Sequence, residues 1–182
     1  LEPETISPMT ELVTAQAEMA IEGADAIIFL TDVHDGVTPV DAEIGAKLRQ
    51  SKKPVALVAN KADNDTMAQS SVEFYQLGLG DPIPISAHHN RGVNRLMETV
   101  FATLPMEEEV EPEEGLLSLA IVGRVNVGKS ALLNAILGEE RAIVSTTPGT
   151  TRDAINTSVD YKGRKLFLID TPGVRRSGRI EP

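Results

Sequence analysis

Short apolar runs alternate with segments of helical periodicity along most of the chain. Three continuous apolar runs, each bounded by turn-forming residues, are typical of parallel strands covered on both faces. They cover residues 26–31, 54–59 and 116–122, and a shorter strand is expected over residues 82–85. Apolar positions at helical spacing predict a helix over residues 8–23, and Thr38 as N-cap with Pro39 in the first turn predicts a second over residues 38–51. Further helices are expected over residues 69–77, 92–104 and 130–137. This alternation predicts an α/β fold with a mostly parallel sheet.

The pattern changes after the last predicted helix. Residues 138–153 are expected to form a loop, because turn-forming and polar residues dominate them. From Ile155 to Tyr161 apolar and polar residues alternate, which predicts a strand with one exposed face, at an edge of the sheet. Lys162 and Gly163 form a tight turn into a second strand over residues 165–169, so these two strands make a hairpin.

Composition limits the classes of protein to consider. The chain has 182 residues, is 41% hydrophobic and contains no cysteine, so neither a disulfide nor a thiolate metal site is available, which suits the cytoplasm. No apolar run approaches the ~20 residues of a membrane span. The net charge is −10 and nothing resembles a basic nucleic-acid-binding footprint, so direct DNA binding is not expected. Much of the negative charge lies in residues 105–115, which we expect to be a solvated linker.

One octapeptide fits the phosphate-binding P-loop pattern G-x-x-x-x-G-K-S. It follows a predicted strand and precedes a predicted helix, which is the context that the motif needs. Its backbone N–H groups and the helix N-terminus would surround phosphate groups. Lys129 would reach the β- and γ-phosphate oxygens, and the Ser130 hydroxyl would hold Mg²⁺. The octapeptide is Gly123, Arg124, Val125, Asn126, Val127, Gly128, Lys129 and Ser130.

A second motif, Asn60-Lys61-x-Asp63, follows another predicted strand. The Asp63 carboxylate can accept hydrogen bonds from N1–H and the 2-amino group of guanine, a pair of donors that adenine lacks. Asn60 would tie this loop to the P-loop, and the Lys61 stem would cover the base. Ser86 and Ala87, after the next strand, would offer a backbone N–H to guanine O6.

A third motif, Asp170-x-x-Gly173, lies at the end of the hairpin's second strand. Asp170 would bind Mg²⁺ through water, and the Gly173 N–H would contact the γ-phosphate. A threonine from the preceding loop would complete the metal shell; Thr150 and Thr151 are both placed for this, and we favour Thr151. When the γ-phosphate leaves, such a loop is released, and this change of conformation is how a nucleotide switch works.

Together these motifs resemble a Ras-like P-loop NTPase with a three-layer fold. The flanking sequences narrow the resemblance to the EngA/Der family of tandem-G-domain GTPases, over nearly the whole chain. This resemblance implies a GTPase that binds GTP and GDP, uses Mg²⁺ and acts as a switch in assembly of the large ribosomal subunit. The flanks that carry it are Asp35-Gly36-x-Thr38-Pro39, Lys53-Pro54-Val55-x-Leu57-Val58-x-Asn60-Lys61, the acidic linker and Pro148-Gly149-Thr150-Thr151-Arg152-Asp153.

On that pattern the chain joins two half-domains, and neither native G domain is complete. Residues 1–104 resemble the second half of the first G domain, residues 105–115 the linker, and residues 116–182 the first half of the second G domain. The chain starts with Leu1, so we expect a cut from a longer parent. The two halves either stay parts of separate sites or form one composite sheet in circularly permuted order. The alternative function is a non-hydrolysing guanine-nucleotide-binding or interaction module.

The resemblance also implies a different mechanism from Ras. Val174 directly follows Gly173, where Ras-like proteins place the glutamine that orients water. The family pattern implies hydrolysis assisted by K⁺, with Asn126 as a K⁺ ligand. The residues expected to act in the reaction are Lys129, Thr151 and Gly173.

Overall fold

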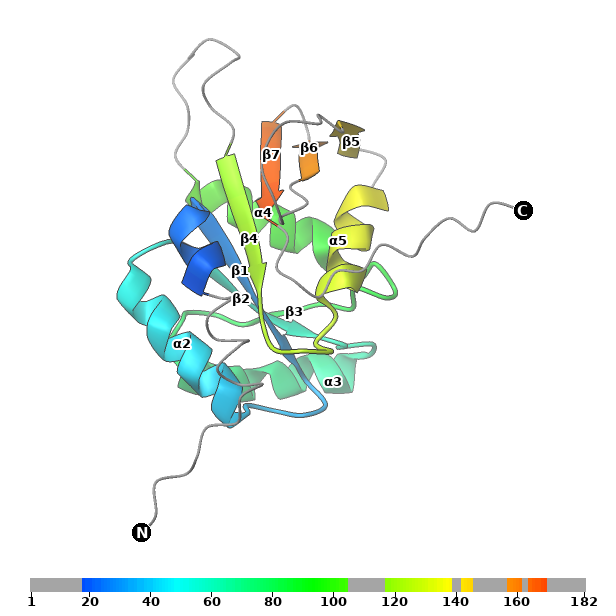
Figure 1. Cartoon of the computed structure of the whole chain (residues 1–182). Coiled ribbons are helices and arrows are strands. Elements are labelled where there is room, and N and C mark those ends of the chain that lie inside the picture. Colours follow the sequence, from blue (N-terminus) through cyan, green and yellow to red (C-terminus); the bar gives the residue numbers. More distant parts are fainter. Residues whose placement is uncertain (1–17, 105–116, 139–141, 146–156, 162–163, 170–182) are drawn as a thin grey trace, which may run out of the picture.

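The structure is a computed structural model that describes residues 18–104, 117–138, 142–145, 157–161 and 164–169. In these residues seven strands form one sheet, in the order β3-β2-β1-β4-β7-β6-β5 (Figure 1). The strands from β3 to β7 pair in parallel, and β6 pairs antiparallel with both β7 and β5. The strands are β1 (Ala26–Asp32), β2 (Val55–Asn60), β3 (Ile83–Pro84), β4 (Leu117–Val122), β5 (Ala142–Ser145), β6 (Thr157–Tyr161) and β7 (Arg164–Ile169).

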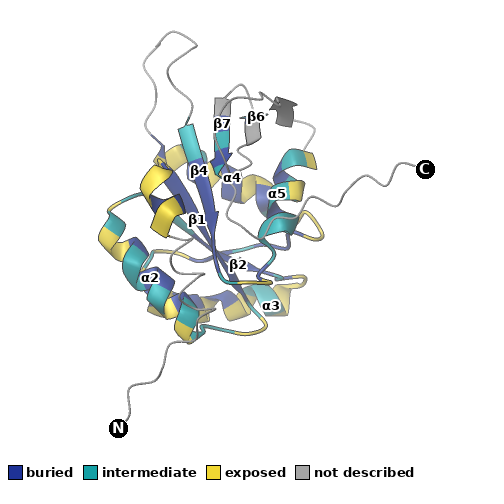
Figure 2. Ribbon diagram, in the orientation of Figure 1, coloured by how far each residue is buried: buried dark blue, intermediate teal, exposed yellow. Residues whose placement is uncertain are grey.

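Helices cover both faces of this sheet and complete the predicted α/β fold. One face packs on α4 (Val93–Thr103) and α5 (Lys129–Gly138). The other face packs on α2 (Pro39–Ser51), on the 3₁₀ helix η1 (Ser70–Leu77) and on helical residues 18–23. The short helix α3 (Asp65–Gln69) precedes η1. Strand β1 is buried along its whole length, and β2 and β4 are buried over their last four residues, as expected of a parallel sheet between two helical layers (Figure 2).

The seam between the two halves of the chain runs through the middle of the sheet. Strand β1 pairs with β4 from Ala26↔Leu119 to Phe29↔Val122. At the start of the seam, Asp25 N–H donates to Ser118 O at 2.7 Å, and Ser118 N–H donates back to the Asp25 carboxylate at 2.7 Å. Both hydrophobic cores contain residues from the two halves. The residues described therefore form one composite sheet, which was one of the two arrangements expected from the sequence.

Aromatic side chains reinforce the seam on the face that carries α4. Tyr161 of β6 is fully buried, and its ring stacks on Phe101 of α4 with centroids 5.3 Å apart. Its hydroxyl donates to Asn94 Oδ1 at 2.9 Å, which satisfies a polar group that burial would otherwise leave unpaired. A helix of the first half is thus packed against a strand of the second.

Two expectations about secondary structure are wrong, and a third differs from the structure in where the helix starts and in its type. Residues 142–145, expected in a loop, form β5, whose four residues are too few to show a periodic pattern. Because β5 pairs with β6, the predicted edge strand is internal, and β5 lies outside it. The helix expected over residues 69–77 begins earlier, at α3, where the Asn64 side chain accepts from Met67 N–H as the N-cap, and it continues as 3₁₀ from Ser70.

None of the helices in the described part of the chain is long and apolar enough to cross a membrane.

Candidate nucleotide-binding site

The P-loop connects β4 to α5 at the carboxyl end of the sheet, where ligands of open α/β sheets bind. Its two glycines are required by close approaches to the first half of the chain. A Cβ on Gly123, whose φ is +155°, would stand 2.4 Å from the Leu30 carbonyl oxygen of β1. A Cβ on Gly128, whose φ is +101°, would stand 2.4 Å from Asn60 Nδ2. The loop is therefore seated directly on residues from the other half.

The Lys129 ammonium lies within the curve of the P-loop. It donates to Gly123 O and Arg124 O, both at 2.7 Å. Burial, together with a smaller contribution from the positive charge of Arg124, lowers the pKa of Lys129 from 10.5 to about 8. The loop thus holds a cation that burial disfavours and that an incoming phosphate would stabilise.

The Asn60 side chain connects the two predicted nucleotide loops. Asn60 is 2% exposed, its Nδ2 donates to Val127 O at 2.7 Å, and its Oδ1 accepts from Ala87 N–H at 3.0 Å. The predicted contact between Asn60 and the P-loop is confirmed. One buried amide therefore fixes three loops relative to one another, across the seam.

Asp63 lies on the surface beside this junction. Its Oδ1 accepts from the hydroxyl of the fully buried Ser86 at 2.6 Å, and its N–H donates to Lys61 O at 2.9 Å. The carboxylate is exposed, so it is accessible to a base. Its role in reading guanine stays a prediction.

The backbone N–H groups of Ser86 and Ala87 already have partners. The Ser86 N–H donates to Arg91 O at 2.9 Å, and the Ala87 N–H donates to Asn60 Oδ1. To contact guanine O6, the Ala87 N–H would have to share its hydrogen between O6 and Asn60. The Ser86 hydroxyl, which the sequence did not single out, is the group that touches Asp63.

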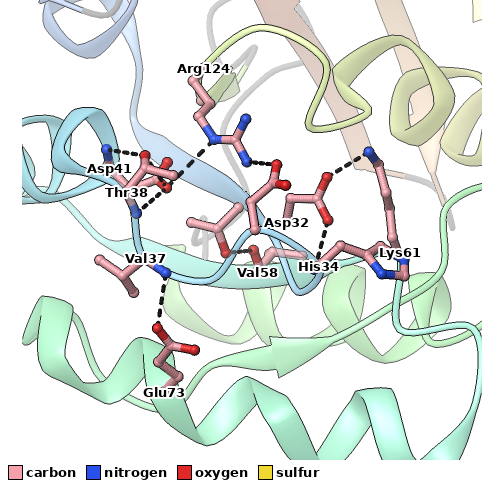
Figure 3. A network of polar contacts seen from close by, with 12 residues as sticks. Asp32, His34, Val37, Thr38, Asp41, Val58, Lys61, Glu73 and Arg124 are labelled. Carbon is pink, nitrogen blue, oxygen red and sulfur yellow. Dashed lines mark hydrogen bonds and ion pairs between the residues drawn. The ribbon is translucent and has the colours of Figure 1, made fainter.

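Sequence reasoning also missed a set of ion pairs beside the loops (Figure 3). The Arg124 side chain, only 18% exposed, pairs with Asp35, and its Nε lies 3.6 Å from Asp41 Oδ2. That second contact is an ion pair without a hydrogen bond, because Arg124 Nε has no hydrogen-bond partner. Arg124 lowers the pKa of the exposed Asp35 carboxyl by hydrogen bonding and by its charge. In the Asn60–Asp63 loop, Lys61 Nζ lies 2.5 Å from Asp32 Oδ2.

Of the residues predicted to hold Mg²⁺, only Ser130, the second residue of α5, lies among the described residues. Its hydroxyl oxygen is a hard ligand of the kind that Mg²⁺ accepts beside phosphate oxygens. Among the described residues no group of three or more His, Asp or Glu side chains could hold a metal. The other predicted Mg²⁺ ligands, Thr151 and Asp170, lie outside the described residues, as do Thr150 and Gly173.

Two comparisons relate the sequence to known proteins. The family described as 50S ribosome-binding GTPase matches residues 118–181. Over 177 residues the chain is 51% identical to GTPase Der of Herpetosiphon aurantiacus, a match that covers 96% of this chain and 39% of the relative. GTPase Der of Thermomicrobium roseum is 52% identical over 174 residues, covering 95% of this chain and 38% of the relative. The chain is homologous to GTPase Der. It spans about 40% of the length of these relatives.

A solved structure supports the fold independently. The crystal structure of YjeQ from Thermotoga maritima superposes with a TM-score of 0.55 at 20% sequence identity. The match covers 83% of this chain and 48% of that chain. At this identity the likeness bears on the fold alone, and it extends across the seam between the two halves.

Proposed function

We propose that this chain binds guanine nucleotides in one composite site and hydrolyses GTP to GDP and phosphate with Mg²⁺. The base would bind at Asn60, Lys61, Asp63 and the 86–87 turn, and the phosphates at residues 123–130. The observation that carries the proposal is the Asn60 side chain, which bonds both Val127 O and Ala87 N–H. It holds the base loop against the phosphate loop, although the two are far apart in the sequence.

Residues of this chain would supply binding and charge stabilisation. The P-loop amides and Lys129 would neutralise negative charge on the β- and γ-phosphates. Bound Mg²⁺, held by Ser130, Thr151 and Asp170, would supply further charge neutralisation at the phosphate oxygens. The Gly173 N–H would contact the γ-phosphate. K⁺ held by Asn126 would take the place of an arginine finger. Asn126 has a left-handed φ of +66°.

The same proposal places the chain within a longer parent. Residues 1–104 would be the second half of one G domain, residues 105–115 a linker, and residues 116–182 the first half of the next. The parent would act in the cytoplasm as a switch in assembly of the large ribosomal subunit. Homology to GTPase Der supports this reading.

Steady-state release of phosphate from GTP by the intact chain tests the hydrolysis proposal. We expect turnover that needs Mg²⁺, is faster in K⁺ than in Na⁺, and is lost in Lys129→Ala. Equal rates in the two salts would remove the K⁺ role. Tight binding of GTP without turnover would favour the second candidate, a non-hydrolysing module, which rests on the resemblance of the chain to halves of two different G domains.

Protonation of Lys129 predicts that GDP binding depends on pH. The free protein has a Lys129 pKa of about 8, and bound phosphate raises it, so binding takes up a proton near pH 8. Affinity for Mg–GDP should therefore fall by up to about tenfold per unit above pH 8 and stay level well below it. At pH 8 about half of the free Lys129 is already protonated, so binding should take up about half a proton. Calorimetric enthalpies in Tris and in HEPES should therefore differ by about half of the difference between the ionisation heats of the two buffers. Equal enthalpies would contradict the assignment.

A further inference from the structure

Asp32 is a buried charge at the rim of the proposed site. It is the last residue of β1, it is 2% exposed, and it pairs in register with Asn60 at the end of β2. Burying a carboxylate is unfavourable unless it is paired and hydrogen-bonded. The Asp32 carboxylate is nevertheless buried beside the loop that carries the proposed base-reading residues. Packing alone does not account for a buried charge at this position.

Both carboxylate oxygens of Asp32 have partners. Oδ2 lies 2.5 Å from Lys61 Nζ, and Oδ1 accepts from His34 N–H at 3.0 Å. Figure 3 shows the Lys61 side chain extended toward Asp32. Lys61 has a left-handed φ of +65°, which is sparsely populated for a residue with a side chain. The ion pair therefore holds the ammonium at one end and the backbone holds the other, which restricts the conformations open to the four-carbon stem between them.

The loop that follows Asp32 is anchored at several points, so the carboxylate is held in place. Val37 N–H donates to Glu73 Oε1 at 3.2 Å. Thr38 N–H and hydroxyl both donate to Asp41 Oδ2, at 3.0 and 2.7 Å. The Arg124–Asp35 pair ties the same loop to the P-loop. Asp32 is thus part of a rigid rim and not of a free loop.

We propose that Asp32 is a positioning residue for base recognition, which acts by holding the Lys61 stem along the face of the bound guanine. The inference rests on the proposed function. A lysine side chain that is already ordered loses little conformational entropy when a base packs on it. Asp32 would therefore increase affinity for the base without touching the nucleotide, and would leave phosphate binding unaffected.

Two ligands separate this role from a structural one. Mg–GDP carries base and phosphates, whereas Mg–pyrophosphate carries phosphates alone. For Asp32→Asn we expect the Kd of Mg–GDP to rise about tenfold, with no change in the Kd of Mg–pyrophosphate. Glu43→Gln is the matched control, since it removes a carboxylate charge on α2 that pairs only at 4.0 Å with Lys47. It should change neither constant.

A second variant, Lys61→Met, changes the exposed partner of the Asp32–Lys61 ion pair. Together with Asp32→Asn and the double variant it forms a double-mutant cycle. If Asp32 acts through Lys61, the Kd of Mg–GDP for Asp32→Asn/Lys61→Met should equal that of Lys61→Met alone. Additive losses, or equal weakening of Mg–GDP and Mg–pyrophosphate by Asp32→Asn, would overturn the positioning role while leaving the proposed function intact. No binding of Mg–GDP by the unsubstituted chain would overturn the proposed function itself, and this inference with it.

Discussion

Replacing Asp63 by Asn is expected to raise the Kd for GDP by roughly 10²–10⁴. The carboxylate would accept two hydrogen bonds from guanine, each worth about 1.5–3 kcal/mol because the acceptor is charged. The asparagine amide can accept only one and presents an N–H₂ toward the 2-amino group. Xanthine has a carbonyl at that position, so Asp63→Asn should gain affinity for xanthosine diphosphate. Titration of GDP and of xanthosine diphosphate into the unsubstituted chain and into Asp63→Asn measures this change of base preference.

Asp65→Asn is the control for that substitution. Asp65 is an exposed acid two residues away, paired with Arg91. Its replacement by Asn removes the same charge as Asp63→Asn, but Asp65 has no proposed role at the base. Its Kd for GDP should stay within about twofold of the unsubstituted value. A GDP affinity that is as high in Asp63→Asn as in Asp65→Asn would show that Asp63 does not read the base.

Replacing Gly123 by Ala is expected to destabilise the chain by about 2–5 kcal/mol and to abolish GDP binding. The new Cβ would stand 2.4 Å from the Leu30 carbonyl oxygen, a backbone atom that cannot move aside without disturbing β1. The φ of +155° adds backbone strain for any residue with a side chain. Relief of the clash would lift the P-loop away from the first half of the chain. Urea unfolding and GDP titration together measure both effects.

Gly138→Ala provides the matched control at the other end of α5. A Cβ there would meet no atom within 4 Å, and alanine favours helix over glycine. Its unfolding free energy should change by no more than about 1 kcal/mol, in the stabilising direction. Because the Gly123 clash involves a residue of the other half, equal stabilities of Gly123→Ala and Gly138→Ala would argue against the seated P-loop and the composite sheet.

The sequence predicts most of the fold because its signals are local. The apolar runs at β1, β2 and β4 and the capping residues Thr38 and Pro39 of α2 are each contained in a few neighbouring residues. Pairing of β1 with β4 was expected only as one of two options, because register across a seam depends on packing surfaces that a sequence does not display. Strand β5 escaped prediction because only its pairing with β6 defines it.

The site was predicted unevenly for the same reason. The P-loop and Asn60 follow from motifs, and the bond from Asn60 to Val127 O confirms that the two loops meet. The ion pairs of Arg124 with Asp35 and of Lys61 with Asp32 join charges on different loops, and no motif specifies them. Likewise, the use of the Ala87 N–H by Asn60 depends on side-chain geometry. The one feature of the sequence that could have drawn attention to Asp32 is its position at the end of a predicted strand. Ligands of parallel α/β sheets bind at the carboxyl ends of the strands.

Calorimetric titration of the intact chain with Mg–GDP, with Mg–ADP as control, tests the composite site most directly. The account predicts that one GDP binds per chain and that ADP does not bind, because the base loop and the phosphate loop of different halves meet at Asn60. A chain that unfolds cooperatively yet binds neither nucleotide would contradict it. The two halves would then belong to separate nucleotide sites, each completed by parts of a longer protein.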